Sequence, residues 1–133
     1  MAGFIRQALP TSTVELSIKC SNLSDRDYLT KSDPVAVIFG KVKGHSKWKE
    51  IWRSEMLNNN LNPEFKKTFV TEYRFEENQP IKIKIIDWDS ADPGVNKDLD
   101  DQDTIGKVDT TMAALVSAPN KQWKSVLKNK HGK

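Results

Sequence analysis

The stretch PIKIKIIDWD, residues 80–89, carries the clearest structural signal in the chain. Its residues alternate between two faces, with Ile81, Ile83 and Ile85 on one and Lys82, Lys84 and Ile86 on the other. This period of two residues predicts a β-strand with an apolar face towards a core and a mostly charged face towards water. The strand runs directly into Asp87 and Asp89, so an acidic segment begins where an apolar strand ends.

Other segments on both sides of this stretch also show strand patterns. Val14, Leu16 and Ile18 alternate with polar residues, and residues 34–39 form a short apolar run typical of a strand packed on both faces. Polar, turn-forming residues separate these segments, and residues 110–117 form the one helix-like patch. Six or seven short strands with polar loops predict an antiparallel β-sandwich. The expected strands are residues 13–20, 34–39, 47–55, 64–75, 80–89, 104–112 and 122–128.

Length and composition favour one ordinary globular domain. The chain has 133 residues, of which 37% are hydrophobic and 29% charged, with a formal net charge of +3. A chain of this size buries roughly two-thirds of its unfolded surface, and no apolar run approaches the ~18 residues of a membrane span. The single cysteine, Cys20, cannot form an internal disulfide, and the start lacks a secretory signal, so we expect a cytoplasmic protein.

Ten of the eleven aspartates lie in two segments that each follow a predicted strand. We expect the two segments to meet at one edge of the sandwich. Clustered carboxylates repel one another unless a cation offsets their charge. Calcium accepts 6–8 oxygen ligands from flexible loops, whereas zinc would need histidine or cysteine, which neither segment contains. The ten residues are Asp25, Asp27, Asp33, Asp87, Asp89, Asp92, Asp98, Asp100, Asp101 and Asp103.

Two other interpretations of the carboxylates fit less well. Residues 98–109 can be aligned to an EF-hand loop, but Asp103 would then stand where glycine is needed, and no helix flanks the segment. Paired carboxylates also occur in glycosidases. Nothing in this sequence predicts a raised pKa or a substrate cleft, so we expect no enzymatic activity. Cys20, at the end of a strand, is expected to pack rather than to react.

Four motifs in order resemble those of C2 domains. Asp27 with SDP at 32–34 is similar to their first calcium loop, and NPEF at 62–65 resembles their Asn-Pro turn. DWD at 87–89, followed by an acidic stretch closing on DTIG at 103–106, is similar to their third loop. Within that superfamily the details resemble the first C2 domain of a copine. The cues are LSDRD…KSDP, WRSEMLNNNLNPEF, EYRFEE and DDQD.

This resemblance implies a fold, a domain extent and a metal site. The fold is an eight-stranded-type antiparallel β-sandwich with type II-like topology, formed by residues 13–128 between an extension at 1–12 and a tail at 129–133. The family normally adds one more strand after these residues, so an edge of the first sheet is expected to be open. That edge could pair with the FIRQALPT segment (4–11) or with another molecule, as a dimer. The implied calcium ligands are Asp27, Asp33, Asp87, Asp89 and Asp103, with Asp101 as the substitute for the last.

The resemblance further implies a module that docks on anionic phospholipid membranes when calcium rises. Phosphatidylserine and phosphoinositides are the expected lipids, and the plasma membrane the expected location. A calcium-independent protein-interaction module on the same fold is the alternative. The net charge is modest and the acidic edge would repel phosphates, so we expect no nucleic acid partner. The expected lipid contacts are loop-tip apolar residues and a basic segment: Tyr28, Leu29, Val95, Leu99, Lys41, Lys43, Lys47, Lys49 and Arg53.

Overall fold

A computed structural model describes residues 11–23, 33–41, 44–88 and 103–128, with residue 103 described for its backbone alone. Within these residues the chain forms six strands, one short helix and one 3₁₀ turn. Their bounds are β1 (Thr11–Leu16), β2 (Pro34–Gly40), β3 (Lys49–Arg53), β4 (Phe69–Arg74), β5 (Pro80–Asp87), β6 (Asp103–Thr111), α1 (Met112–Val116) and η2 (Pro119–Lys121). None of the helices in the described part is long and apolar enough to cross a membrane.

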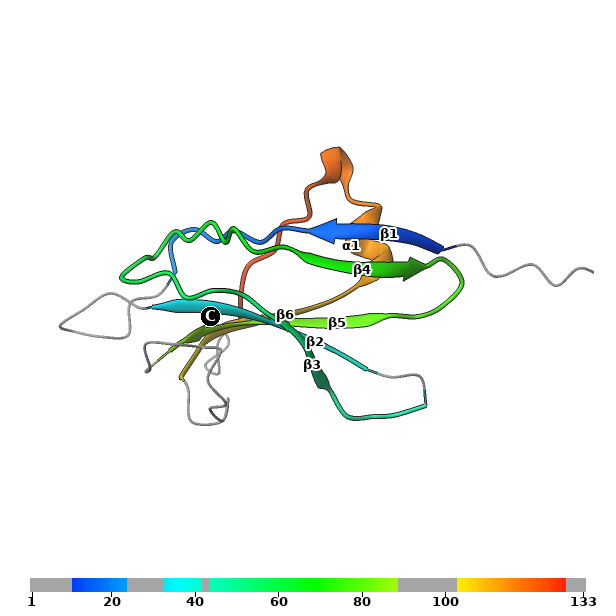
Figure 1. Cartoon of the computed structure of the whole chain (residues 1–133), viewed down its shortest axis with the longest axis horizontal. Helices are drawn as coiled ribbons and strands as arrows, with labels where there is room; N and C mark the ends of the chain where they lie inside the picture. The colour runs from blue at the N-terminus through cyan, green and yellow to red at the C-terminus, as the bar shows by residue number, and fades with distance from the viewer. Residues whose placement is uncertain (1–10, 24–32, 42–43, 89–102, 129–133) are drawn as a thin grey trace, which may run out of the picture.

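The strands form two antiparallel layers, as Figure 1 shows. One layer is the pair β1–β4, and the other is a four-stranded sheet in the order β3-β2-β5-β6. Two isolated antiparallel bridges, Lys19–Glu64 and Lys107–Lys128, extend the pairing beyond the named strands. The predicted antiparallel sandwich is therefore confirmed. In the described part of the chain, β4 is the one strand that pairs with β1. The segment predicted to pair with the open edge, residues 4–11, lies outside the described residues except for Thr11.

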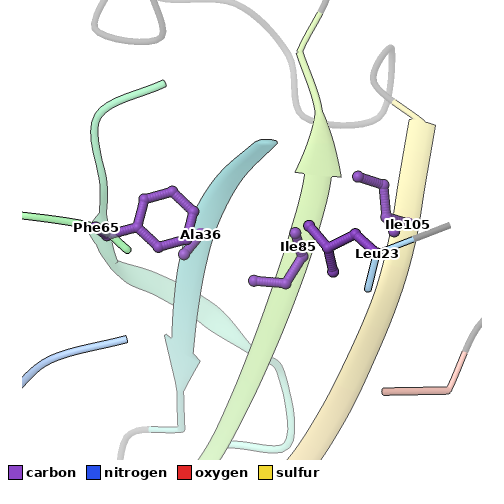
Figure 2. Close-up of a cluster of buried hydrophobic side chains, with 5 residues drawn as sticks. All are labelled: Leu23, Ala36, Phe65, Ile85 and Ile105. Carbon is purple, nitrogen blue, oxygen red and sulfur yellow. The ribbon is translucent and has the colours of Figure 1, made fainter. Parts of the chain in front are cut away.

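The main core lies between the two layers. Figure 2 shows one of its clusters, in which Ala36, Ile85 and Ile105 of the four-stranded sheet meet Leu23 and Phe65. A neighbouring cluster joins Ile38, Phe69, Ile81 and Met112, with the partly buried Val14, Leu16 and Ile18 against it. The alternation seen in the sequence therefore predicted the inward faces of β1 and β5 correctly.

A second apolar cluster covers part of the outer face of the four-stranded sheet. Val35 and Val37 of β2 pack with Ile86 and Trp88, and each of these four side chains is at most 2% exposed. Phe39 and Met56 lie partly buried against them. The short apolar run of β2 is thus buried on both faces, as its composition predicted.

The alternation along residues 47–55 does not mark a single inner face of the strand. A bulge explains why. Ile38 pairs with Trp52 and Phe39 pairs with Glu50, so Ile51 is an extra residue in β3. Trp52 consequently packs in the core, while Ile51 remains 42% exposed. A one-residue insertion of this kind interrupts the period of two that marks a strand.

The strand predicted at residues 122–128 is wrong for most of its length. Only Lys128 pairs, through two backbone hydrogen bonds with Lys107 of 2.8 and 2.9 Å. The segment leaves η2 with Asn120 and Lys121 at positive φ. Leu127 then packs so closely on Gly106 that a Cβ built there would lie 2.8 Å from the Leu127 Cβ. The segment therefore touches the sheet through its last two residues.

Candidate functional site

Three strand ends meet at one edge of the four-stranded sheet. β2 begins, β5 ends and β6 begins there, and their backbones are in register: Pro34 pairs with Asp87, and Asp87 pairs with Asp103. Figure 1 shows the beginning of β2 and the end of β5 at the same side of the molecule. The fold therefore gathers the base of the first acidic segment and both ends of the second.

Asp33 makes hydrogen bonds to three residues of this edge. Its backbone N–H donates to Oδ1 of Asp87 at 2.9 Å, and its carbonyl accepts from the backbone N–H of Trp88 at 3.1 Å. Its own Oδ1 accepts from the backbone N–H of Asn59 at 2.7 Å. Asp33 therefore joins the end of β5 and the turn before β4 to the start of β2.

A bulge in β6 sets which residue lies opposite Asp87. Ile85 pairs with Gly106, whereas Ile86 pairs with Thr104, so Ile105 is the extra residue. If the pairing continued regularly from Ile85–Gly106, Thr104 would lie opposite Asp87; because of the bulge, Asp103 takes that position. Ile105 is held in the bulge by burial, since its side chain is 4% exposed in the core. Bulges are common beside functional sites because they change which side chains lie together.

Part of the predicted site lies outside the described residues. This applies to the ligand candidates Asp27, Asp89 and Asp101 and to the lipid-contact candidates Tyr28, Leu29, Val95, Leu99 and Lys43. Within the described residues, no group of three or more histidine, cysteine, aspartate or glutamate side chains could hold a metal ion. Asp33 and Asp87 are the two predicted ligands whose side chains the structure places, and the backbone N–H of Asp33 donates to the Asp87 carboxylate.

The donor chemistry of this edge fits calcium. Asp33 and Asp87 offer carboxylate oxygens, which are the hard donors that calcium prefers. The described residues of the edge include neither histidine nor cysteine, which zinc would require. Because the Asp33 N–H donates to the Asp87 carboxylate and the Asn59 N–H donates to that of Asp33, both carboxylates are already oriented.

The outer face of the four-stranded sheet carries a row of cations. Register pairs join Arg53 to Val37, Val37 to Lys84, Lys84 to Lys107 and Lys107 to Lys128. Residues directly opposite each other share one face of a sheet, and like charges in that position destabilise it. We use the name basic face for the cations of this row together with two neighbouring lysines. Its members are Arg53, Lys84, Lys107, Lys128, Lys41 and Lys82. Such a concentration of like charge is favourable when an anion binds across it.

Aromatic rings support two parts of the basic face. The Nζ atoms of Lys41 and Lys82 both lie 4.6 Å from the ring centroid of Trp48, and Lys84 Nζ lies 5.3 Å from that of Phe39. Burial lowers the pKa of Lys82; Lys107, Lys84 and Lys41 lower it further, while Asp109 opposes them. The ammonium groups are thus close enough to repel one another.

The basic face differs from the basic segment predicted from the sequence. Lys41 and Arg53 belong to both, while Lys47 and Lys49 are exposed on or beside β3. Arg53 forms a two-pronged ion pair with Glu50, at 2.7 and 2.8 Å, and its guanidinium lies 5.0 Å from the Trp88 ring centroid. Arg53 therefore covers the outer apolar cluster next to the aspartate edge.

Sequence reasoning did not select Lys82, Lys84, Lys107 and Lys128 as a binding surface, nor Asn59 as part of the aspartate edge. The alternating lysines of β5 were a usable signal, since they mark the outer face of a strand. Their meeting with Lys107 and Lys128 depends on strand pairing, which the sequence does not display.

Cys20 takes no part in either surface. It packs against the core cluster of Figure 2, and burial raises the pKa of its thiol to about 11. A thiol with this pKa stays protonated at neutral pH, and the thiolate is the reactive form. The expected packing role of Cys20 agrees with this position.

Comparisons with known proteins identify relatives along most of the chain. The family model described as "C2 domain" matches residues 13–126. Copine-A and Copine-D of Dictyostelium discoideum are 40% and 39% identical over 124 residues each, which is 93% and 92% of this chain. Nicotinic receptor-associated protein 1 of Caenorhabditis elegans is 36% identical over 130 residues. The chain spans 19%, 23% and 20% of the lengths of these relatives.

Solved structures show the same fold. The structure named BON1-C2B is 28% identical, with a TM-score of 0.59, covering 79% of this chain and 67% of that one. Human GIVD cytosolic phospholipase A2 aligns over 96% of this chain and 15% of its own, with a TM-score of 0.65 and 16% identity. At that identity the second match shows the fold alone. The predicted resemblance to C2 domains and copines is confirmed, whereas the position as a copine's first C2 domain stays a prediction. By its motifs, its two-layered fold and the extent of the family match, the chain belongs to the C2 domain family.

Proposed function

We propose that this C2 domain is a calcium-dependent module that docks on anionic phospholipid membranes. One observation carries the proposal: the fold brings Asp33, Asp87 and the backbone of Asp103 together at one edge, with Asp33 hydrogen-bonded to the Asp87 carboxylate. Asp33, Asp87 and Asp103 would hold calcium together with Asp27 and Asp89, or with Asp101 in place of Asp103. Bound calcium would offset the negative charge of the edge and offer coordination positions to lipid phosphates.

The chain's own residues supply the rest of the mechanism. Before calcium binds, the carboxylates of the edge repel anionic lipid, so the edge disfavours docking. After their charge is offset, the same edge can approach phosphates, and lipid and calcium then strengthen each other's binding by the same factor. Tyr28, Leu29, Val95 and Leu99 are the proposed apolar contacts at the interface.

The basic face is the proposed second contact with the membrane. Each basic residue near an anionic surface contributes about 1 kcal/mol of attraction. Lys84, Lys107 and Lys128 form one row, so several phosphates of a lipid headgroup could be bound together. Lys41, Lys43, Lys47 and Lys49 would extend this attraction along β2 and β3. We further propose that the protein moves from the cytoplasm to the plasma membrane when calcium rises.

Calorimetric titration of calcium, with and without phosphatidylserine vesicles, tests the proposal. We expect saturable calcium binding that strengthens when vesicles are present and is lost in an Asp87→Asn/Asp89→Asn variant. Asp109→Asn is the control for calcium binding without vesicles, because Asp109 is the one aspartate outside the two acidic segments. It is not compared with vesicles present, since Asp109 lies opposite Lys82 of the basic face. Absence of calcium binding in the unmodified chain at millimolar calcium would contradict the proposal and favour the calcium-independent protein-interaction module.

A further inference from the structure

The asparagine-rich turn at residues 57–62, LNNNLN, lies directly against Asp33. The backbone N–H of Asn59 donates to Asp33 Oδ1 at 2.7 Å, and that of Leu57 donates to the Pro34 carbonyl at 3.2 Å. Asn59 has a φ of +50°, in the left-handed region. Asparagine is enriched there, whereas a β-branched residue is strongly disfavoured.

The same turn is fixed to the base of the first acidic segment. Asn62 Oδ1 accepts from the backbone N–H of Asn22 at 2.8 Å, and the Leu61 carbonyl accepts from the N–H of Leu23 at 2.9 Å. Within the turn, Asn60 Oδ1 accepts from the Asn62 N–H at 2.8 Å. Because it is anchored on residues 22–23, the turn presents the Asn59 N–H to Asp33 in one defined position.

A carboxylate that is already oriented binds a metal ion with a smaller entropic penalty. The Asn59 bond uses one oxygen of Asp33, and a carboxylate has two, so the bond sets the direction in which the other oxygen points. Immobilising a free side chain opposes binding, and the Asn59 bond removes part of that penalty for Asp33 before a metal ion binds.

From this geometry we propose that Asn59 is a positioning residue for Asp33, and that its left-handed backbone sets the calcium affinity of the domain. The inference rests on the proposed function, because it concerns the same calcium site. The inference assigns a role to a segment other than the two acidic ones, the turn at residues 57–62. This turn carries no negative charge, so a search for acidic ligands does not select it.

Calcium titration of three variants tests this role. Asn59→Val places a β-branched residue at a left-handed position, which is strained by about 1–3 kcal/mol unless the turn moves away from Asp33. We expect it to weaken calcium binding by about tenfold. Asn59→Gly accepts this φ freely and keeps the N–H, so it should restore the affinity to within about threefold of the unmodified chain. Asn58→Val, the adjacent control with no positive φ, should bind as the unmodified chain does.

Hydrogen exchange of the Asn59 amide, measured without calcium, tests the bond itself. We expect protection in the unmodified chain and in Asp33→Asn, whose amide oxygen still accepts, and faster exchange in Asp33→Ala. Equal protection in all three would overturn the inference. The inference would also be overturned if Asn59→Val bound calcium as tightly as the unmodified chain. That result would leave the proposed function intact. Should Asn59→Val not fold, Asn59→Ala carries the same comparison with a smaller side chain.

The two proposals fail in different ways. If the unmodified chain binds no calcium, the proposed function fails and the effect of Asn59 on affinity fails with it, even if the Asn59 amide is protected. If calcium binds, and Asn59→Val and Asn58→Val bind it equally well, only the positioning role fails.

Discussion

At the scale of single residues, buried polar atoms at the start of the four-stranded sheet are satisfied by one side chain. Ser54 is 4% exposed, and its hydroxyl accepts from the backbone N–H of Ala36 at 2.8 Å and donates to the Glu55 carbonyl at 2.7 Å. Its own N–H donates to the Ala36 carbonyl at 2.8 Å. Ser54 thus replaces a ladder bond where β3 ends, next to the strand start that carries Asp33.

Replacing Ser54 by alanine should destabilise the domain by about 1–3 kcal/mol, because the buried N–H of Ala36 would lose its acceptor. Urea unfolding measures this change directly. Ser17→Ala, at an exposed position of the other layer, is the control and should stay within about 0.5 kcal/mol of the unmodified chain. A loss for Ser54→Ala no larger than that for Ser17→Ala would show that water replaces the hydroxyl at no penalty.

At the level of single residues, the sequence identified charged candidate ligands more readily than the uncharged residues that position them. Asp33 and Asp87 were predicted to meet, and the backbone N–H of Asp33 does donate to the Asp87 carboxylate. Asn59 was not selected, because an asparagine between strands has the composition of any turn. Its role depends on a backbone N–H and a positive φ, and neither is visible in residue type alone.

At the scale of elements, alternation predicted which strands form but not where their register shifts. β2 and β5 follow the expected pattern, while the bulges at Ile51 and Ile105 interrupt it. The shift at Ile105 decides that Asp103 lies opposite Asp87. A bulge has no sequence signature of its own, because it is selected by pairing and burial rather than by local propensity.

The contact between Gly106 and the segment at 127–128 yields a test at this scale. A Cβ at Gly106 would lie 2.8 Å from the Leu127 Cβ, so Gly106→Ala should displace Leu127 and break the pairing of Lys107 with Lys128. We expect a loss of about 1–3 kcal/mol in unfolding free energy, as for other overpacked sites. Loss of protection of the Lys128 amide in hydrogen exchange would locate the change.

Gly40→Ala is the matched control for that substitution. The added Cβ there would lie 3.1 Å from Ile51 Cδ1, the end of a flexible and partly exposed side chain that can move aside. Gly40→Ala should therefore be tolerated better than Gly106→Ala. The reverse order would mean that the 127–128 segment yields easily and contributes little to the sheet.

At the scale of the whole molecule, opposite charges are separated onto different surfaces. Ten of eleven aspartates lie in two sequence segments whose described ends, at Asp33, Asp87 and Asp103, meet at one edge, while lysines form a row across the outer face of the same sheet. The net charge of +3 hides this separation. Order along the chain was enough to predict that the ends of the two acidic segments meet. The basic face combines Arg53 of β3 with lysines of β5 and β6, Lys41 and Lys128, and so required the fold.

This separation predicts that salt and calcium act on different parts of membrane binding. Lys84→Gln/Lys107→Gln removes two members of the row, each contributing about 1 kcal/mol near an anionic surface. Binding to phosphatidylserine vesicles at saturating calcium should therefore weaken by about twentyfold to thirtyfold at 0.1 M salt. At 1 M salt the screening length falls to about 3 Å, so the variant and the unmodified chain should bind alike.

The comparison needs a control with the same loss of charge, and Lys19→Gln/Lys66→Gln provides it, because both lysines are exposed and lie outside the basic face. Sedimentation with vesicles measures all three proteins. An equal loss in both double variants would mean that net charge alone matters and that the row has no special role. A loss confined to Lys84→Gln/Lys107→Gln, with calorimetric calcium affinity unchanged without lipid, would show that the basic face contacts the membrane independently of the aspartate edge.

Removing one lysine also relieves repulsion within the row, so Lys107→Gln should be slightly more stable than the unmodified chain at low salt. Vesicle binding would then weaken while the stability of the fold increased. This opposite change is expected of residues that bind a ligand and do not stabilise the fold.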